Sequence, residues 1–133
     1  MVQTYKKGSN AERELMQRLW NAGYAVVRAA GSGVNPLNSP DLIALKKGKK
    51  LAIECKARNS TTLSVPSQQM SDLIEWAFRA DAELVVAWKY PRKGWFFLGL
   101  EDFSRSEKFY SASLKKALEK NASFLEGEST PSI

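Results

Sequence analysis

Hydrophobic residues recur along the chain at two different spacings, which predict helices and strands in alternation. Near the N-terminus, helical intervals separate Ala11, Leu15, Leu19 and Ala22. Ser9 and Glu12 have the spacing of a capping box, which predicts that this first helix begins at Ser9, and Gly23 is placed to end it. Residues 31–40 are rich in Gly, Ser, Asn and Pro and are predicted as a long loop.

Short runs of β-branched, aliphatic and aromatic residues predict five strands. These runs cover residues 24–29, 41–46, 51–56, 84–88 and 95–100. Lys47-Gly48-Lys49-Lys50 joins the second run to the third as a β-hairpin, and residues 91–94 join the last two runs.

Two further helices follow a polar loop over residues 57–65. Pro66 opens the first of them, whose apolar stripe contains Met70, Leu73, Ile74, Ala77 and Phe78. The last helix covers residues 113–120, with its inward side formed by Leu114, Ala117 and Leu118. The predicted order is α-β-β-β-α-β-β-α, an α/β fold with one central mixed five-stranded sheet flanked by helices. We expect a single domain over residues 1–125 and a flexible tail over residues 126–133.

Composition excludes several classes of protein. The chain of 133 residues suffices for one domain, and 44% hydrophobic with 26% charged residues is typical of a soluble globular protein. No apolar run approaches the roughly 18 residues of a membrane-spanning helix, and the N-terminus has no hydrophobic signal segment. Cys55 is the only cysteine, so we expect no intramolecular disulfide and a cytoplasmic location. The absence of histidine excludes Ser-His triads, histidine-ligated zinc and imidazole acid/base catalysis.

Positive charge gathers in the first half of the chain. The formal net charge is +6, from 20 Lys and Arg against 14 Asp and Glu. Residues 1–60 carry eleven basic and four acidic side chains, a net charge of +7, whereas residues 61–133 carry a net charge of −1. This bias favours a polyanionic partner, because neutralising phosphates releases their counterions. A basic protein with a well-solvated surface is the other interpretation.

The predicted hairpin brings three reactive side chains to one face. Because side chains alternate along a strand, Glu54 and Lys56 share one face. The other, core-facing side carries Leu51, Ile53 and Cys55. A loop at Lys47-Gly48 places Asp41 opposite Glu54, and a loop at Gly48-Lys49 places it opposite Lys56. Either register puts Asp41 on the same face, with about 5 Å between directly opposed Cβ atoms.

This group of side chains has two interpretations. Lys56 and the two acids would form an ordinary salt-bridge cluster if the face is simply solvated. Alternatively, Asp41, Glu54 and the backbone carbonyl of Cys55 would hold a divalent cation, Mg²⁺ or Mn²⁺, because such hard ions prefer oxygen ligands. Lys56 would then hold or help deprotonate an attacking water and stabilise charge on a phosphate.

Pro40-Asp41 followed by Glu54-Cys55-Lys56 resembles the signature of PD-(D/E)xK nucleases. The wider pattern, from about Tyr5 to Trp88, resembles that of the archaeal Holliday junction resolvase (Hjc) family. The matching segments are Lys7-Gly8 and residues 11–15, 23–28, 31–33, 40–44 and 53–56. The resemblance implies a restriction-endonuclease-like fold and a homodimeric, Mg²⁺-dependent endonuclease, with Mn²⁺ able to substitute. Its substrate would be branched DNA, a four-way junction resolved by paired symmetric nicks.

The resemblance also assigns roles to individual residues. Asp41 and Glu54 would be the main metal ligands, and Lys56 the catalytic lysine. Glu12 would complete the metal site from the first helix, directly or through water; its alternative role is the capping box. The residues that would contact DNA or the scissile phosphate are Lys7, Arg13, Arg28, Ser32 and Gln69. Ser32 would also act catalytically from its glycine-flanked loop, and solvated surface roles are the alternative for this set.

The stretch containing Ile74, Trp76 and Phe78 corresponds to one that packs across the dimer interface in the family. Ile74 and Phe78 also fit an ordinary core, so Trp76, which lies off their stripe, is the better interface candidate. Residues 88–95 interleave aromatic and basic residues, which is typical either of single-strand binding or of a basic hairpin turn. The alternative functions are another PD-(D/E)xK repair or restriction-like endonuclease and a non-catalytic basic DNA-binding module.

Overall fold

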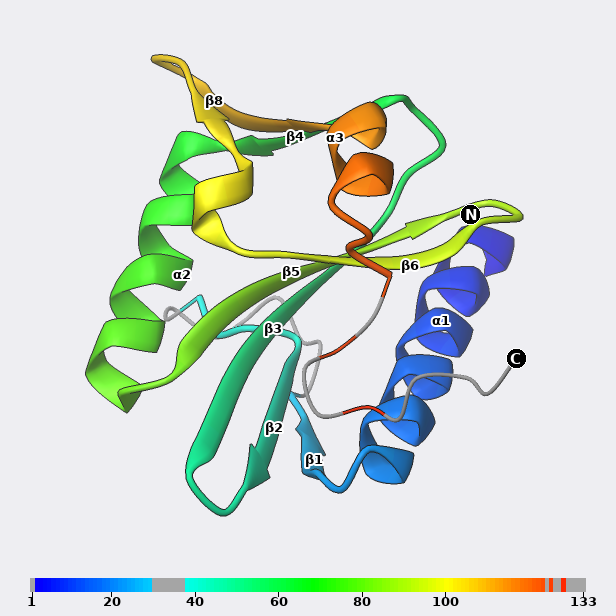
Figure 1. The fold of residues 1–133 in the computed structure, drawn as a ribbon, viewed down its shortest axis with the longest axis vertical. Coiled ribbons are helices and arrows are strands. Elements are labelled where there is room, and N and C mark those ends of the chain that lie inside the picture. The colour runs from blue at the N-terminus through cyan, green and yellow to red at the C-terminus, as the bar shows by residue number, and fades with distance from the viewer. Residues whose placement is uncertain (1, 30–37, 124, 126–127, 129–133) are drawn as a thin grey trace.

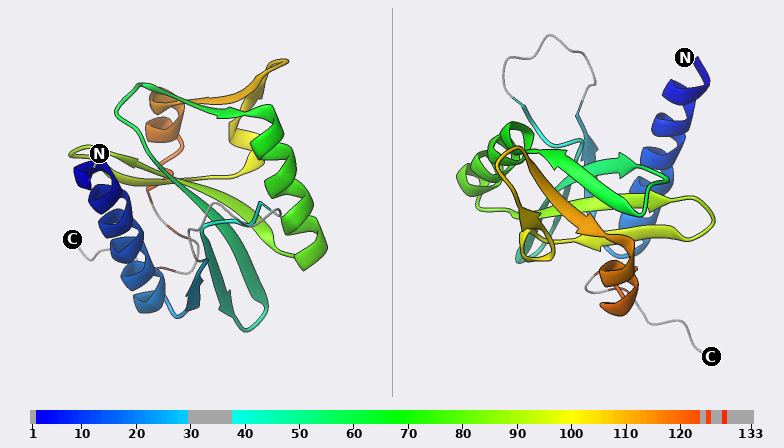
Figure 2. Two further views of the ribbon diagram at one scale, coloured as in Figure 1. Left: turned by 180° about the vertical axis from the view of Figure 1, so that it is seen from behind. Right: turned by 90° about the horizontal axis from the view of Figure 1, so that it is seen from above.

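A five-stranded sheet forms the centre of the molecule, with a helix on each side (Figure 1). The computed structural model describes residues 2–29, 38–123, 125 and 128, with side chains from residue 10 onward. Helix α1 (Val2–Asn21) and helix α2 (Ser67–Ala80) lie on opposite sides of this sheet, which the reverse view also shows (Figure 2).

The central sheet has the strand order β1-β2-β3-β5-β6. Its strands are β1 (Ala25–Arg28), β2 (Leu42–Lys46), β3 (Lys49–Ala57), β5 (Glu83–Tyr90) and β6 (Gly94–Leu98). β3 and β5 pair in parallel, and the other neighbours pair antiparallel. The predicted mixed five-stranded sheet is therefore confirmed, with each strand close to its predicted position.

A second sheet of three strands, in the order β4-β8-β7, packs over the α2 side. It consists of β4 (Thr62–Pro66), β7 (Ser104–Arg105) and β8 (Phe109–Ser113). A 3-10 turn, η1 (Leu100–Asp102), precedes β7, and helix α3 (Leu114–Glu119) follows β8. The prediction of a loop over residues 57–65 is wrong, because β4 lies within this stretch. The strand is hard to recognise in the sequence, since it is short and only Leu63 and Val65 enter the core, between polar residues.

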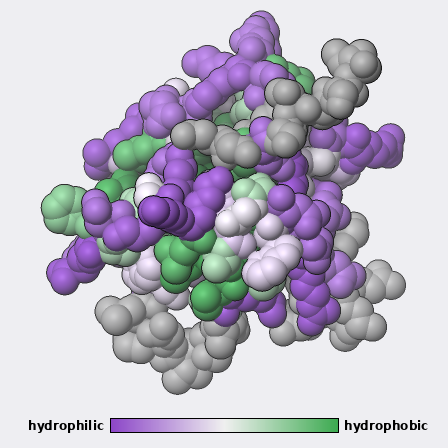
Figure 3. Space-filling view, turned by 60° about the horizontal axis from the view of Figure 1, so that its bottom comes forward, coloured by the Kyte–Doolittle hydropathy of each residue, from purple (hydrophilic) through white to green (hydrophobic). Residues whose placement is uncertain are grey.

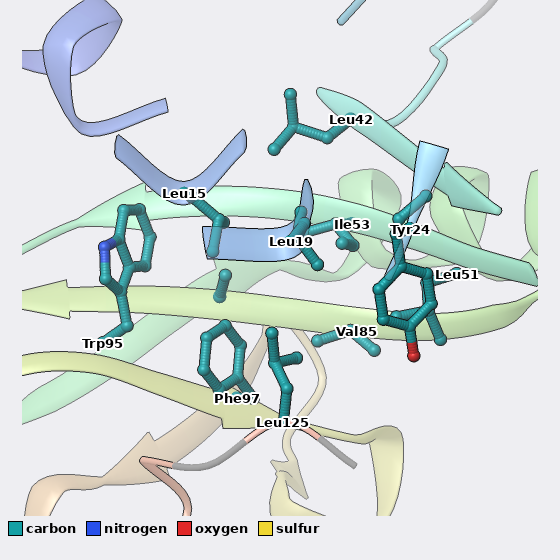
Figure 4. Close-up of a cluster of buried hydrophobic side chains, with 12 residues drawn as sticks. Leu15, Leu19, Tyr24, Leu42, Leu51, Ile53, Val85, Trp95, Phe97 and Leu125 are labelled. Carbon is teal, nitrogen blue, oxygen red and sulfur yellow. The ribbon is translucent and has the colours of Figure 1, made fainter. Parts of the chain in front are cut away.

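Each face of the central sheet buries its own core. Alternate residues of β5 point to opposite faces of the sheet. Val85 therefore packs in the core beneath α1, and Val86 packs in the core beneath α2. Figure 4 shows Leu15 and Leu19 of α1 among the side chains of the first core, which also contains Ile53 of β3. This two-sided burial explains the continuous hydrophobic run of β5. It also fixes β3, the strand that carries Glu54 and Lys56, at the middle of the molecule.

The helices differ from their predicted bounds and faces. α1 begins at Val2, so Ser9 lies inside the helix and the predicted capping box has no helix end to cap. α2 begins directly after Pro66, as predicted. Phe78 of α2 is 85% exposed and Leu118 of α3 is 49% exposed, because the buried faces of both helices are narrower than their apolar stripes. Within the described residues, no helix is both long and apolar enough to cross a membrane.

Arg18 links α1 to the C-terminal segment through a forked ion pair. Its Nε and Nη2 donate to the two carboxylate oxygens of Glu128 at 2.8 and 2.9 Å, and Nη2 also donates to the carbonyl of Ser123. The guanidinium lies 4.9 Å from the ring centroid of Phe97. These contacts hold Leu125 in the core beneath α1, because the backbone N–H of Leu125 donates to the same carboxylate.

We expect Arg18→Met to lower the free energy of unfolding by about 1–3 kcal/mol, because it removes partly buried, charge-assisted hydrogen bonds. The hydrogen bond from Arg18 holds the pKa of Glu128 below its usual 4.5. The ion pair therefore stabilises the fold above about pH 4.5, and its contribution is lost as the pH falls through the lowered pKa.

Urea unfolding at pH 7 and at pH 3 measures both effects. The control is Arg79→Met, which breaks an exposed pair with Glu75 on the surface of α2 and should cost under about 0.5 kcal/mol. Equal losses in the two variants would contradict a structural role for the Arg18 fork.

Candidate active site

The β2–β3 hairpin sets Asp41 against Glu54. The turn lies at Lys47-Gly48, with Gly48 at φ 78°, and the ladder runs from Lys46 opposite Lys49 to Leu42 opposite Ile53. Extending this register by one residue brings Asp41 opposite Glu54, which confirms one of the two predicted registers. The Asp41 carboxylate accepts a hydrogen bond from the backbone N–H of Cys55 at 2.8 Å and so lies against β3.

Glu54 is a buried carboxylate beside a second carboxylate. Glu54 is only 8% exposed to solvent. Burial, and then the charge of Asp41, raise the pKa of Glu54 to about 7, although Lys56 acts in the opposite direction. The positive charge of Lys56 therefore compensates only part of the cost of placing the two carboxylates together.

Gln69 connects Glu54 to Lys56. It projects from the first turn of α2, donating through Nε2 to Glu54 at 2.8 Å and accepting from Lys56 Nζ at 3.0 Å. Lys56 Nζ lies 3.7 Å from Glu54, and both side chains are largely buried. The structure thus places Gln69 between the predicted catalytic lysine and a predicted metal ligand, where it orients both.

Cys55 separates these side chains along β3 and faces the opposite way. Its side chain packs half-buried against the core beneath α1, which confirms its predicted core-facing role. Burial raises the pKa of the Cys55 thiol well above its usual range, so the side chain is a neutral thiol. A ligand role for its backbone carbonyl stays a prediction.

Glu12 and Arg28 form an ion pair at the α1 side of the hairpin. Arg28 Nε donates to Glu12 Oε1 at 2.7 Å, joining a predicted metal ligand to a predicted phosphate contact. In the part of the chain that the structure describes, no three acidic or cysteine side chains gather closely enough to hold a metal ion. Glu12 is therefore not assembled with Asp41 and Glu54, and its ligand role stays a prediction.

The remaining predicted site residues lie outside this cluster. Arg13 is exposed on α1. The side chain of Lys7 and all of Ser32 lie outside the described residues. On α2, Ile74 packs against the core beneath that helix and Trp76 is half-buried, which leaves Phe78 as the most exposed of the three interface candidates.

A polar cavity of about 370 Å³ adjoins Glu54 and was not predicted. Its lining residues are Asn38, Ser39, Glu54, Gln68, Gln69, Asp72 and Leu73. Asp72 accepts hydrogen bonds from Gln68 and Asn38 across this cavity. The only signal in the sequence is the helical spacing of Gln68 and Asp72, which does not identify Asn38 as a partner.

The donor set fits a hard divalent cation. Asp41 and Glu54 offer carboxylate oxygens, which are the ligands that Mg²⁺ prefers. Burial, and then the charge of Asp41, disfavour the ionised form of Glu54 and raise its pKa. A bound cation would stabilise that ionised form, as Lys56 does in part.

Comparisons with known proteins identify a family that this chain matches. Residues 3–129 match a family model described as archaeal Holliday junction resolvase (Hjc). The chain is 41% identical over 102 residues to the crossover junction endodeoxyribonuclease Hjc of Archaeoglobus fulgidus, an alignment covering 77% of this chain and 75% of that relative. The protein of the same name from Sulfolobus acidocaldarius is 37% identical over 103 residues, covering 76% of this chain and 71% of the relative.

A solved structure is similar over most of its length. The structure of Archaeoglobus fulgidus Hjc, a Holliday junction resolvase from an archaeal hyperthermophile, matches with a TM-score of 0.79 and 35% sequence identity. The match covers 84% of this chain and 93% of that one, so the mixed sheet with its flanking helices is the shared fold.

We expect Glu54→Gln to stabilise the metal-free protein by roughly 1 kcal/mol near pH 8, because it removes a buried charge beside Asp41. The folded-state pKa of Glu54, about 7, lies above the ordinary value of 4.5. Wild-type stability should therefore fall as the pH rises through this range, since the folded state binds the proton more tightly. The variant should lack this part of the pH dependence.

Thermal unfolding in EDTA between pH 5 and 8 checks this expectation. Adding Mg²⁺ should then raise the midpoint for the wild type but not for Asp41→Asn. Identical pH profiles for wild type and Glu54→Gln would mean that neither burial nor Asp41 raises the pKa of Glu54 in the folded protein.

Proposed function

The chain belongs to the archaeal Holliday junction resolvase (Hjc) family, which makes it a crossover junction endodeoxyribonuclease, and we propose that Asp41, Glu54 and Lys56 form its active site. The observation that carries this proposal is the buried carboxylate of Glu54 between the half-buried Asp41 and the largely buried Lys56 side chain. A structural salt bridge needs one acid for one base, whereas this group has an excess of negative charge. That excess favours a bound cation.

The proposed chemistry is hydrolysis of a phosphodiester. Asp41 and Glu54 would hold Mg²⁺, or Mn²⁺ in its place, which when bound would lower the pKa of a water and stabilise charge on the phosphate. Lys56 Nζ would orient the attacking water and stabilise the developing negative charge. Gln69 would keep Lys56 and Glu54 in their relative positions through its two hydrogen bonds.

Basic side chains at the end of β5 support a DNA-contact surface at the end of the sheet where β3 also ends. β3 and β5 run parallel with Ala57 opposite Lys89, so both strands end on this side. Arg92 and Lys93 are exposed in the turn that follows β5. We infer that these residues contact phosphates of a four-way junction, because such contacts release counterions and position the backbone. A DNA substrate also supports an intracellular site of action.

An exposed apolar surface supports a homodimer. Ile43 and Leu45 alternate with residues buried beneath α1, so they point to the α2 side of the sheet, as does the neighbouring Val27. Val27 and Leu45 remain exposed there, as does Phe78 of α2. Figure 3 shows hydrophobic side chains gathered on the face that carries the β2–β3 end of the molecule. A two-fold dimer through this face would give paired nicks, since a four-way junction offers two equivalent strands.

We expect the wild type to introduce paired nicks into a labelled four-way junction in Mg²⁺ and none in EDTA. Asp41→Asn should reduce the cleavage rate by about two to three orders of magnitude or more, and Lys56→Met by about a hundredfold. Junction affinity of Asp41→Asn should be at least that of the wild type, because the substitution removes a charge that repels phosphates.

Glu75→Gln, on the exposed side of α2, is the matched control and should cleave like the wild type. Duplex, flap and single-stranded DNA test whether cleavage is selective for the junction. Junction binding that is independent of metal and without cleavage would favour a non-catalytic basic module, whereas cleavage of every DNA would favour a less selective nuclease.

We expect Phe78→Glu to shift the protein from dimer to monomer at micromolar concentration, because it replaces a highly exposed apolar side chain of the proposed interface with a charge. Light scattering after size exclusion measures the mass directly. Leu118→Glu, an exposed apolar position on α3, is the control and should leave the mass unchanged. A monomeric wild type, or a dimeric Phe78→Glu, would overturn the proposed interface.

A further inference from the structure

The segment that leads into Asp41 is fixed at three places. Asp41 itself precedes β2, and its backbone carbonyl accepts from the N–H of Ala29 at 2.9 Å. Its carboxylate accepts from the N–H of Cys55. The third place lies upstream of the buried Pro40, where the amide of Asn38 donates to the carboxylate of Asp72 on α2.

Asp72 holds Asn38 and Gln68 on the same carboxylate. Asn38 Nδ2 donates to one carboxylate oxygen, and Gln68 Nε2 donates to the other at 3.0 Å. Because Gln68 lies one helical turn before Asp72, its hydrogen bond holds the carboxylate in one orientation, aimed at Asn38. Asp72 is half-buried, whereas Asn38 is exposed and both hydrogen bonds lie at the surface.

The first turn of α2 also contacts Glu54 of β3, through Gln69. Gln69 lies beside Gln68 in the first turn and donates to Glu54 at 2.8 Å. Met70 anchors this turn in the core beneath α2, which restricts the positions of the neighbouring polar side chains. Glu54 is therefore positioned from α2 through Gln69, and the chain leading to Asp41 is positioned from α2 through Asp72.

We propose that Asp72 is a positioning residue, which sets the distance between the Asp41 and Glu54 carboxylates by holding Asn38 against α2. This inference rests on the proposed function of that pair. Asp72 acts only through Asn38 and Gln68. Its effect on the site is one of placement, because a displacement of about 1 Å in a catalytic group can cost about a hundredfold in rate.

The expected result for Asp72→Ala is a kcat for junction cleavage about 10- to 100-fold below that of the wild type, with the junction dissociation constant changed by less than about twofold. Asn38→Ala should have the same effect, and the double variant should be no worse than either single one, because both remove one contact. Glu75→Ala, on the same helix, is the control and should leave kcat unchanged.

An exchange of the two side chains separates positioning from general structural damage. Asn38→Asp alone places a carboxylate against the carboxylate of Asp72, so this variant should have the lowest kcat of the Asn38 and Asp72 variants. Adding Asp72→Asn restores the hydrogen bond with donor and acceptor reversed, so the Asn38→Asp/Asp72→Asn double variant should recover kcat to within about threefold of the wild type. The stabilisation by Mn²⁺ in thermal unfolding without DNA should follow the same order, because it reports the carboxylate spacing independently of cleavage.

Two results would overturn the inference: wild-type kcat in Asp72→Ala, or no recovery in the exchange variant when circular dichroism shows it folded. Asp41→Asn is measured in the same series. If Asp41→Asn abolishes cleavage and Asp72→Ala does not reduce it, the positioning role fails while the proposed active site stands. If Asp41→Asn cleaves like the wild type, the proposed active site fails.

Discussion

The site depends on two carboxylates that are held together against their own repulsion. Asp41 and Glu54 face each other because the Lys47-Gly48 turn sets the register of β2 on β3. Burial makes the second negative charge more costly, which is the main reason that the pKa of Glu54 is raised. Such a pair persists only in a rigid frame. The backbone of β3 supplies that frame for Asp41 through Cys55, and the two hydrophobic cores keep β3 itself in place.

Helix α2 is the second part of the frame, and the smaller sheet determines where this helix begins. β4 runs directly into α2 at Pro66, and β4 pairs with β8. The N–H of Ser67, the first residue of α2, donates to the carbonyl of Lys108 at 2.8 Å. Gln69 follows within the same turn and contacts both Glu54 and Lys56. The smaller sheet therefore helps to position the proposed active site, although Asp41, Glu54 and Lys56 lie outside its strands.

The sequence predicts the central sheet well because its strands are long hydrophobic runs and Gly48 marks the hairpin turn. The same hairpin register predicts that Asp41, Glu54 and Lys56 share a face. Pairs between distant elements are not predictable in this way: Glu12 with Arg28 and Asn38 with Asp72 join residues 16 and 34 positions apart. β4 was missed because Thr and Ser alternate with its two buried residues, and the start of α1 was misplaced because Ser9 and Glu12 mimic a helix terminus.

The proposed active site and the contact between Arg18 and Glu128 differ in how much of the chain must be ordered to form them. Asp41 bonds to Cys55 and Lys56 to Gln69 across 14 and 13 positions, whereas Arg18 and Glu128 are 110 positions apart. Short loops lose less conformational entropy on closure than long ones. The carboxylates, Lys56 and Gln69 all lie within residues 38–72, so the contacts among them close short loops. The contact between Arg18 and Glu128 closes a much longer loop, so its formation costs more conformational entropy.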